Sequence, residues 1–574
     1  MKTLIKYLKP YYVRMLIGFI IKVAGTVVEL FIPYILSHVL KNVIVRQSIK
    51  ETVLGGVMMI VCAVLCCYLN IVANRMAAYV SRNFSETLRR DLFYKTLSLS
   101  ASQTDKFTIA SLESRITTDT YNIHNFVGMM QRMGVRAPIL FLGGIVVTMI
   151  MDIYLSLAVL CVLPFVFFIV LFISKKGIPL YSRVQKSVDN MVRVVREDVS
   201  GIRVIKALSK NEHEHLRYDN TNKALVKDEE TAGITMGLVN PIMTFLMNLG
   251  IVAVIWLSAS RVSVGKSDPE TVIAFMQYFT MLSMAMLATT RMFAMYSKCA
   301  ASAKRVQEVL LCEEELSEFS SEDFPEKETD AFIEFDNVSF SYEGNKPDIS
   351  EISFKLQKGG SLGIIGSTGS GKSTIIGLLL RLYDVSSGNI YISGLDIRTM
   401  KKSELYALFG TVLQNDFLFA DTIAENIRFG RSISDEQLFD ATKISQAHEF
   451  ISSFAEGYNH VLSQKATNIS GGQKQRVLIA RSLADSPEIL ILDDSSSALD
   501  YKTEAALRSA LNEKKNNTTF ITVAQRVSAV KQCDLILVLD GGRIIGSGTH
   551  EQLLSSCVEY REISDSQLGG AFLA

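Results

Sequence analysis

Two short stretches carry the residues best suited to chemistry. The first is "GSTGSGKST", which follows apolar "SLGII" and precedes apolar "IIGLLL". This order predicts a strand, a glycine-rich turn and a helix, in which backbone N–H groups curl around phosphates at the helix start. The predicted phosphate-binding residues are Gly366, Ser367, Thr368, Gly369, Ser370, Gly371, Lys372, Ser373 and Thr374.

The second stretch is "ILILDDSSSALD", which begins at Ile489 and ends at Asp500. Four apolar residues that end in two carboxylates predict a buried strand delivering acids to a phosphate site. We expect Asp493 to hold Mg²⁺ through water while Ser373 ligates the ion directly, so ATP and Mg²⁺ are the predicted cofactors. The neighbouring Asp494 is the candidate catalytic carboxylate.

A third motif, "NISGGQKQR", opens a predicted helix with two glycines and offers another anion site. Taken alone, this is an ordinary glycine turn. Between the phosphate-binding loop and the acidic strand, it resembles the signature motif of ABC transporters. The resemblance assigns nucleotide contacts to Ser470, Gly471, Gly472 and Gln473.

Three further positions fit the same family. Tyr342 in "VSFSYEG" resembles the aromatic residue that stacks on adenine. Gln414 in "VLQNDFLF" resembles the glutamine that senses Mg²⁺ and the membrane domain. The segment 497–500, which ends in Asp500, resembles the loop that follows the acidic strand in this family.

The family resemblance implies two ATP sites, each formed between the phosphate-binding loop of one chain and the signature motif of the other. A glutamate normally follows the metal-binding aspartate, and a histidine from a later strand contacts the γ-phosphate. This chain has Asp494 and Gln525 at these positions. The shorter carboxylate falls back about 1.3 Å, and a misplacement of about 1 Å can cost about 100-fold in rate.

Both altered residues belong to the site of this chain's own phosphate-binding loop, whereas the signature motif lent to a partner is intact. We therefore expect a heterodimer, in which a different half-transporter supplies the Glu and the His. The alternative is a slow homodimer that tolerates both variants. A further difference is that Gln464 and Lys465 replace an acidic residue usual just before the signature.

The elements that must position these residues fall into two parts. The chain has 574 residues, is 48% hydrophobic and 20% charged, and has a net charge of +1, so no electrostatic case for nucleic-acid binding arises. Six apolar segments are each long enough to cross a lipid bilayer. They cover residues 13–36, 52–74, 134–151, 154–174, 237–260 and 271–295.

The expected fold is therefore an all-α, six-helix transmembrane domain with long intracellular helices, followed by an α/β ATPase domain. The expected boundaries are 1–311 for the transmembrane domain, 312–330 for an acidic linker and 331–574 for the ATPase domain. Cations are concentrated between segments two and three and between segments four and five, which predicts that these loops, both termini and the ATPase domain are cytoplasmic. The family resemblance, which is strongest to bacterial heterodimeric multidrug exporters, implies a bacterial plasma membrane. Within these loops, "SLESRITTDTYN" and "VIKALSKNEHEH" resemble coupling helices, the second reaching the partner chain.

The predicted cargo is a small amphipathic molecule, because the sixth segment is rich in methionine and aromatic residues. Ordinary helix packing explains the same pattern. Arg291 is a candidate contact for an anionic group or an interfacial cation, and Glu29 and Lys22 are predicted to interact with each other or with water. Rival functions are a lipid flippase, a peptide exporter and an ATP-switched regulator that transports nothing; the short lead into the first helix disfavours a peptide exporter with a fused peptidase. The eight cysteines are expected to be reduced.

Overall fold

The computed structural model describes most of the chain. The described residues are 2–44, 48–262, 269–313, 316, 319, 324, 326–342, 344, 346–414, 416–495, 498–514 and 518–568. Some side chains within 158–178, 239–247 and 290–294 also lie outside the description, including that of Arg291. About half of the predicted linker 312–330 lies outside it as well.

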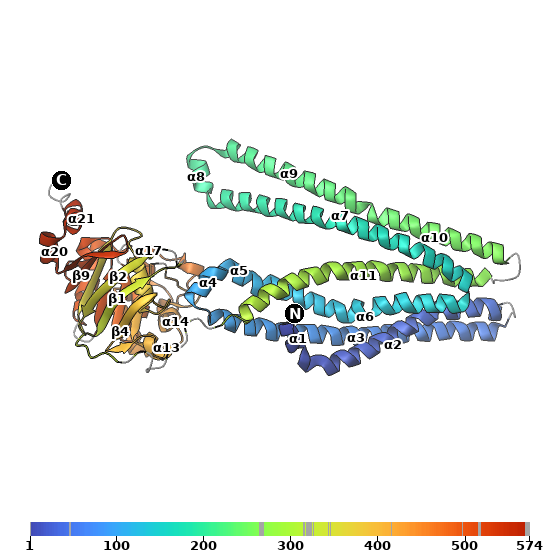
Figure 1. Ribbon diagram of the computed structural model, residues 1–574, viewed down its shortest axis with the longest axis horizontal. Helices are drawn as coiled ribbons and strands as arrows, with labels where there is room; N and C mark the ends of the chain where they lie inside the picture. Colours follow the sequence, from blue (N-terminus) through green and yellow to red (C-terminus); the bar gives the residue numbers. More distant parts are fainter. Residues whose placement is uncertain are drawn as a thin grey trace. The chain divides into compact units, whose positions relative to one another are not determined.

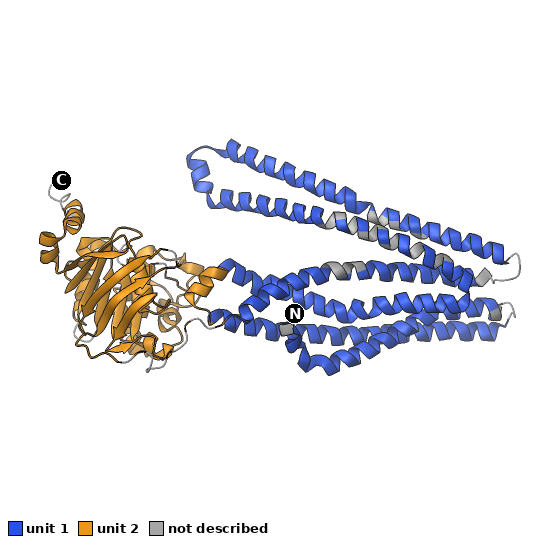
Figure 2. Cartoon of the chain, in the orientation of Figure 1, with its two compact units in different colours: residues 1–97, 109–312 blue, residues 98–108, 313–574 orange. Residues whose placement is uncertain are grey.

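The chain forms two compact units (Figure 2). Unit 1 comprises residues 1–97 and 109–312, and unit 2 comprises residues 98–108 and 313–574. A short segment of the first long loop therefore belongs to the same unit as the C-terminal residues.

Unit 1 is helical (Figure 1), as expected for backbone that must satisfy its own hydrogen bonds in lipid. Its α-helices are α1 Lys2–Leu8, α2 Tyr12–His38, α3 Ile49–Leu97, α5 Ile109–Ser114, α6 Thr120–Met151, α7 Ile153–Ser200, α8 Ile202–Ala207, α9 Asn211–Gly237, α10 Val239–Val262 and α11 Pro269–Leu310. Five spans among the described residues are long and apolar enough to cross a membrane. The fourth expected segment, 154–174, lies in α7, where many side chains are outside the description.

Two helices are much longer than a membrane is thick. α3 has 49 residues and α7 has 48. At 1.5 Å per residue each is about 70 Å long, whereas the hydrocarbon core is about 30 Å thick. The prediction of long helices that continue into the cytoplasm is confirmed.

Small residues allow the helices α2, α3, α6 and α11 to pack closely. A Cβ atom on Gly143 of α6 would lie 2.4 Å from Leu30 Cδ1 of α2. On Gly144 it would lie 3.0 Å from Leu282 Cδ2 of α11. Such contacts are typical of helix association in lipid, where packing replaces the hydrophobic effect.

The helices α7 and α9 pack side by side and are joined at their tip by α8 (Figure 1). Towards this tip the pair diverges from α6 and α11 of the same unit. Ile202, Val204 and Leu208 at the tip are exposed apolar residues. This segment corresponds to the second predicted coupling helix.

Unit 2 contains two β-sheets. The antiparallel sheet has the order β2-β1-β4-β5, and the larger sheet has the order β10-β9-β3-β8-β7-β6. In the larger sheet the strands β9, β3, β8, β7 and β6 are parallel, with β10 antiparallel at one edge. The strands are β1 Ile333–Phe340, β2 Ile349–Leu356, β3 Ser361–Gly366, β4 Ser387–Ile392, β5 Leu395–Asp396, β6 Phe409–Val412, β7 Ile489–Asp493, β8 Thr519–Val523, β9 Leu535–Asp540 and β10 Arg543–Gly548.

The strand β3 lies between β8 and β9 and is buried almost throughout. Its continuous apolar run is typical of a parallel strand covered on both faces. A separate apolar core joins several of the helices into a lobe beside the sheets. The helices of unit 2 are α4 Ala101–Phe107, α12 Lys372–Leu379, α13 Lys402–Ala407, α14 Ile423–Arg428, α15 Asp435–Ile444, α16 His448–Ser453, α17 Gly471–Leu483, α18 Tyr501–Asn512, α19 Val527–Val530, α20 His550–Ser556 and α21 Val558–Leu568.

The segment of the first long loop that is grouped with unit 2 differs from the first predicted coupling helix. The prediction placed it in 111–122, but those residues lie in unit 1, and the segment grouped with unit 2 is 98–108 with the helix α4. Ser100 caps α4 by accepting a hydrogen bond from the Gln103 backbone N–H (3.1 Å). The prediction missed α4 because this helix is short and polar and lacks the apolar helical spacing that singled out 111–122.

Glu29 and Lys22 were expected to interact with each other or with water, but their hydrogen bonds go to other residues. The Lys22 ammonium donates to Asn70 Oδ1 (2.7 Å) and Asn74 Oδ1 (3.1 Å) on α3. Glu29 instead accepts two hydrogen bonds from Arg136 on α6. Spacing along one helix could not reveal these partners, because each belongs to another helix.

All eight cysteines are unbridged, as predicted.

Candidate functional site

The phosphate-binding loop connects β3 to α12, the strand-turn-helix order predicted from the sequence. Gly369 and Gly371 have positive φ angles of 83° and 98°. A Cβ on Gly371 would lie 2.6 Å from Ile349 Cγ2, and one on Gly366 would lie 2.2 Å from the carbonyl oxygen of Leu539. Gly371 is therefore favoured by both conformation and space, Gly369 by conformation and Gly366 by space.

Lys372, Ser373 and Asp493 meet where α12 begins and β7 ends. The Ser373 hydroxyl donates to Asp493 Oδ2 at 3.1 Å. The Lys372 ammonium donates to the carbonyl oxygens of Gly366 (3.0 Å) and Ser367 (2.7 Å). Burial raises the pKa of Asp493, and burial lowers the pKa of Lys372. A cationic partner such as a metal ion would stabilise the charged form of Asp493.

These groups face a cavity of about 300 Å³. Both altered residues, Asp494 and Gln525, line this cavity. Asp494 follows β7 with a positive φ of 49°, and its N–H donates to the Val523 carbonyl oxygen (2.9 Å). The other lining residues are Tyr342, Asp348, Thr368, Gly369, Gly371, Lys372, Ser373, Thr374, Gln414, Asp493, Val523 and Ala524.

The donor set fits a nucleotide with Mg²⁺ better than a metal held by protein alone. The described residues contain no group of three or more His, Cys, Asp or Glu side chains arranged to hold a metal ion. Mg²⁺ is commonly bound by one or two protein oxygens together with phosphates and water, which matches Ser373 and Asp493. In the described part of the loop, the buried Ser370 hydroxyl lacks a hydrogen-bond partner.

The predicted adenine-stacking residue has an aromatic neighbour that sequence reasoning missed. Half of Tyr342 is exposed, and its hydroxyl donates to Thr374 Oγ1 (3.3 Å). Its ring contacts that of Tyr383 edge-on, with 5.1 Å between centroids. The Tyr383 hydroxyl donates to Asp105 Oδ2 of α4 (2.7 Å).

Unit 2 thus contains a continuous path of contacts from the side chain at the nucleotide cavity to the helix α4. Burial raises the pKa of Tyr383, and the nearby Asp105 carboxylate raises it further, so its hydroxyl remains a hydrogen-bond donor at neutral pH. No spacing in the sequence links residue 105 to residue 383. Only the tertiary fold brings them together.

The signature motif lies elsewhere, at the start of α17, and none of its residues lines the cavity. Ser470 Oγ accepts from the Gln473 N–H (3.2 Å), and Gln473 Oε1 accepts from the Ser470 N–H (2.9 Å). This capping box defines the helix start, and both Ser470 and Gly471 are exposed. A helix start that is exposed in one chain is suited to an anion held by another chain.

Asp500 also lies outside the cavity. Its carboxylate caps α18 by accepting from the Thr503 N–H (2.9 Å) and the Thr503 hydroxyl (2.7 Å). These hydrogen bonds lower the pKa of Asp500. Ser497, at the start of the same predicted loop, is outside the described residues.

Comparison with known proteins agrees with both units. Residues 15–286 match the family described as ABC transporter transmembrane region, and residues 349–497 match the family described as ABC transporter. The uncharacterized ABC transporter ATP-binding protein YfiB of Bacillus subtilis is 34% identical over 572 residues, which cover 99% of each chain. The putative ABC transporter ATP-binding protein exp8 of Streptococcus pneumoniae is 31% identical, covering 99% of this chain and 97% of the other.

A solved structure shares the fold. The structure of a bacterial Atm1-family ABC exporter with ATP bound matches with a TM-score of 0.78, covering 98% of this chain and 99% of the other at 23% identity. These two sequence relatives span nearly the whole chain. The chain therefore belongs to the ABC transporter family, as an integral membrane half-transporter with an exporter fold and a cytoplasmic ATPase domain.

Proposed function

We propose that this chain is the subunit with the impaired ATP site in a heterodimeric exporter of amphipathic small molecules. The observation that carries the proposal is the separation of two sets of residues. Asp494 and Gln525 line the same cavity as Lys372, whereas the signature motif at the start of α17 lies outside it and is unaltered.

The groups for binding Mg-ATP are present in the chain's own cavity. Ser373 and Asp493 would hold Mg²⁺, with Gln414 beside them, while the backbone of the phosphate-binding loop and Lys372 would hold the phosphates. Bound Mg²⁺ neutralises phosphate charge. Exposed Tyr342 offers a ring face for the adenine.

The groups for hydrolysis are weakened in the same cavity. The Asp494 carboxylate is one methylene shorter than the usual glutamate, which moves it about 1.3 Å from the expected water position, and about 1 Å can cost about 100-fold. Gln525 donates a hydrogen bond but never carries a positive charge. A nucleotide at this site therefore remains bound for longer than one at a site with Glu and His.

Transport requires that nucleotide binding be transmitted to the transmembrane helices. We infer that α4 performs this within the chain, because Tyr383 contacts both Tyr342 and Asp105. Base stacking on Tyr342 would restrict the Tyr383 ring, and its hydroxyl would hold α4. This path responds to nucleotide binding and does not depend on hydrolysis at the impaired site.

We infer that the second coupling helix, α8, docks on the partner. Its tip exposes Ile202, Val204 and Leu208. Unit 2 has an aromatic cavity of about 430 Å³ in which Phe417, Phe419 and Phe429 pack near one another. Such a cavity suits the apolar tip of a partner's equivalent helix, and this chain's α8 would enter the matching cavity of the partner.

The polar base of that cavity supports the same assignment. Arg481 donates to Asp416 Oδ1 (2.5 Å) and to the Phe417 carbonyl oxygen (2.7 Å). The pair fixes the loop that follows Gln414, so a helix seated on the aromatic residues would act directly on the loop of the predicted Mg²⁺-sensing residue. The loop that follows Gln414 would therefore link docking of the partner's helix to nucleotide binding.

The test is to purify the chain alone and together with candidate half-transporters that carry Glu and His, and to measure ATP hydrolysis and outward transport in vesicles. We expect ATP binding without robust hydrolysis by the chain alone, and substrate-stimulated hydrolysis by the complex. Robust hydrolysis by the chain alone would support the slow-homodimer alternative. Hydrolysis by the complex without movement of any small amphipathic probe would reject small-molecule export; lipid and peptide probes in the same vesicles then test a flippase and a peptide exporter. A complex that moves none of these probes would support a regulator.

A further inference from the structure

An ion pair joins two helices that are candidate membrane spans, where charges are costly. Glu29 lies on α2 and Arg136 on α6, both within candidate membrane spans. Arg136 Nε donates to Glu29 Oε2 (3.1 Å), and Arg136 Nη2 donates to Glu29 Oε1 (2.5 Å). Ionisable residues inside a membrane are rare and commonly line a substrate path.

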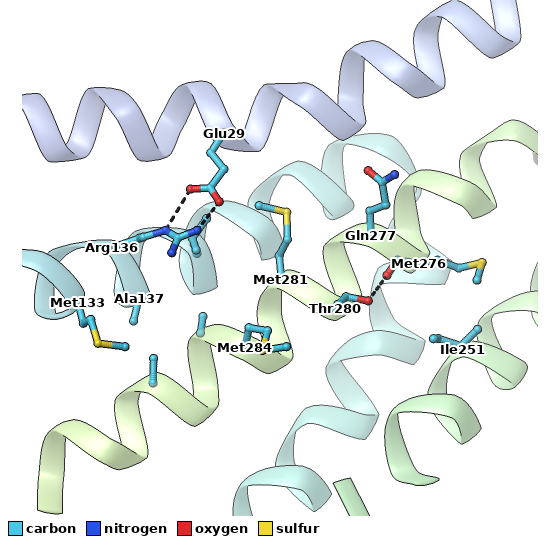
Figure 3. A pocket seen from close by; sticks show the side chains of 13 residues that line it. Glu29, Met133, Arg136, Ala137, Ile251, Met276, Gln277, Thr280, Met281 and Met284 are labelled. Atoms are coloured by element: carbon cyan, nitrogen blue, oxygen red, sulfur yellow. Dashed lines mark hydrogen bonds and ion pairs between the residues drawn. The ribbon is translucent and has the colours of Figure 1, made fainter. Parts of the chain in front are cut away.

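The pair borders a cavity of about 750 Å³ within unit 1 (Figure 3). The opposite wall is formed by α11, which contributes three methionines and two alanines in addition to polar Gln277 and Thr280. The volume is within the range of about 300–1,000 Å³ that suits a drug-sized ligand. The methionines that line the cavity are Met133, Met276, Met281 and Met284.

The ion pair is not symmetric with respect to exposure. The Arg136 side chain is 46% exposed, whereas that of Glu29 is 20% exposed. The bidentate contact uses one N–H on Nε and one on Nη2, so three of the five guanidinium N–H groups remain for another acceptor. Among the described residues, Arg136 has no hydrogen-bond acceptor other than Glu29. Arg136 therefore has N–H groups available to donate hydrogen bonds to a ligand in the cavity.

The charge balance around the pair favours an anion. Arg132 lies one turn before Arg136 on α6, and its Nε donates to the Gly128 carbonyl oxygen (3.1 Å). Arginine stays protonated in proteins, so α6 carries two fixed positive charges near one carboxylate, Arg136 at the cavity and Arg132 outside its lining. Lys22 lies about two turns before Glu29 on α2. Its ammonium donates to the side-chain amides of Asn70 and Asn74, and no carboxylate among the described residues lies within ion-pair distance of it. A cationic head group would meet an excess of like charge.

We propose that this cavity binds amphipathic molecules with an anionic head, such as a carboxylate, sulfate or phosphate, with the head at Arg136 and the apolar body against the methionines. The assignment rests on the proposed export function and specifies its substrate class. The occupant is a free amphipath, since a cavity of about 750 Å³ suits a drug-sized molecule. Flexible thioethers accommodate apolar bodies of different shapes.

The competing interpretation is that the pair only holds α2 against α6. The two readings differ in what happens when one partner is neutralised. Removing either partner of a structural pair damages the same contact, so Glu29→Gln and Arg136→Gln would have the same effect. If Arg136 binds the ligand, Arg136→Gln weakens anion binding, whereas Glu29→Gln removes the competing negative charge, leaves only one side-chain acceptor oxygen beside Arg136 and strengthens anion binding.

The experiment uses the complex with its partner, in discs of neutral phosphatidylcholine. Binding is measured for three fluorescent dodecyl probes that share the same body and carry a carboxylate, a trimethylammonium or a neutral sugar head. We expect the carboxylate probe to bind best. Arg136→Gln should weaken it by roughly 10- to 100-fold, the value of a hydrogen-bonded charged contact, while the neutral probe changes little.

Arg132→Gln is the matched control, because it removes a cation from the same helix but does not line the cavity. We expect a change of less than about threefold from this loss of a more distant charge. Thermal unfolding and basal ATP hydrolysis verify that each variant is folded. If Arg136→Gln does not fold, the exchanged pair E29R/R136E retains the contact between helices and the same comparison of head groups applies, with preference for the carboxylate retained.

Three results would overturn the proposal. Arg136→Gln could keep the wild-type preference for the carboxylate, Glu29→Gln and Arg136→Gln could weaken all probes equally, or phosphatidylglycerol in the discs could displace the probe completely, which would identify a lipid as the occupant. Failure of the export function is distinguishable in a separate vesicle assay of the same complex, because no probe would then move outward on addition of ATP. Export of all probes without head-group preference would reject only the substrate class.

Discussion

The helices α12 and α17 both begin at a glycine turn suited to phosphate, yet their surroundings differ. The start of α12 lies in a cavity with Asp493, Asp494 and Gln525. The start of α17 is exposed and is fixed by the Ser470–Gln473 capping box, and its sequence keeps the predicted signature motif. Binding depends on backbone N–H groups and a lysine, whereas hydrolysis depends on a few side chains. One chain can therefore retain the first at α12 and contribute to the second through α17.

The strongest test of this difference is Gly471→Asp at the start of α17. A Cβ at Gly471 meets nothing closer than 3.9 Å, so the substitution adds charge without steric strain. A carboxylate beside a bound phosphate opposes the anion site, and loss of one stabilising donor at a reacting centre already costs about 10²–10³ in rate. We expect hydrolysis by the complex to fall by at least about 100-fold, while nucleotide binding by this chain alone is unchanged.

Gly471→Ala is the control for that variant, since it adds the Cβ without the charge. We expect it to keep most of the hydrolysis. The measurement is steady-state ATP hydrolysis with nucleotide binding measured separately. Unchanged hydrolysis in the Gly471→Asp complex would show that α17 does not contribute to the partner's site.

The reverse test restores the usual Glu and His side chains at the two altered positions of the nucleotide cavity. Asp494→Glu with Gln525→His should raise hydrolysis at this chain's own site by roughly 100-fold, since each change returns a group to the reacting position. The assay is single-turnover hydrolysis in a complex whose other site has been inactivated. The positive φ of Asp494 is more readily adopted by Asp or Asn than by longer residues, so unfolding of the variant is measured in parallel.

Asp494→Asn is its control, because it keeps the side-chain size and the positive φ but removes the charge. We expect no gain in hydrolysis and little change in nucleotide binding. If the Glu and His together give no gain, Asp494 and Gln525 are not the cause of the impairment, and the difference between α12 and α17 lies elsewhere.

A smaller effect, on transport per ATP hydrolysed, is expected at Tyr383, which connects the nucleotide cavity to α4 through its contacts with Tyr342 and Asp105. Tyr383→Phe removes the hydroxyl that donates to Asp105 but keeps the ring beside Tyr342. Loss of about 1 kcal/mol of hydrogen bonding predicts roughly fivefold less transport per ATP hydrolysed. Tyr406→Phe, at a tyrosine of unit 2 that lacks a hydrogen bond in the described residues, should leave the ratio unchanged. An equal fall in both variants would argue against the path through Tyr383.

The smallest expected effect concerns the capping box itself. Ser470→Ala removes the side-chain acceptor for the Gln473 N–H and should lower the free energy of unfolding by about 1 kcal/mol. Ser470→Asn, which can still cap the helix, should restore stability in chemical denaturation. If the Asn variant restores stability but hydrolysis by the complex stays low, the Ser470 hydroxyl has a role in the partner's site beyond capping.

Much of the architecture was predictable from the sequence because the signals are local. Apolar runs of sufficient length specify transmembrane helices, and the strand-glycine-helix order around Lys372 specifies a nucleotide loop. The same holds for Asp493, because an apolar strand that ends in an acid places that acid at the edge of a parallel sheet. In the structure, Tyr342, Gln414, Asp494 and Gln525 line one cavity with Asp493.

The partners of polar side chains were decided only by the tertiary structure. Glu29 and Lys22 share a helix and were expected to meet, yet each finds a partner on another helix. The contact between Tyr383 and Asp105 joins residues 278 positions apart. A sequence period reports which face a residue occupies, but the neighbour across that face depends on how the helices and strands pack, and this is why docking at α4 and the charged wall of the transmembrane cavity emerged only from the fold.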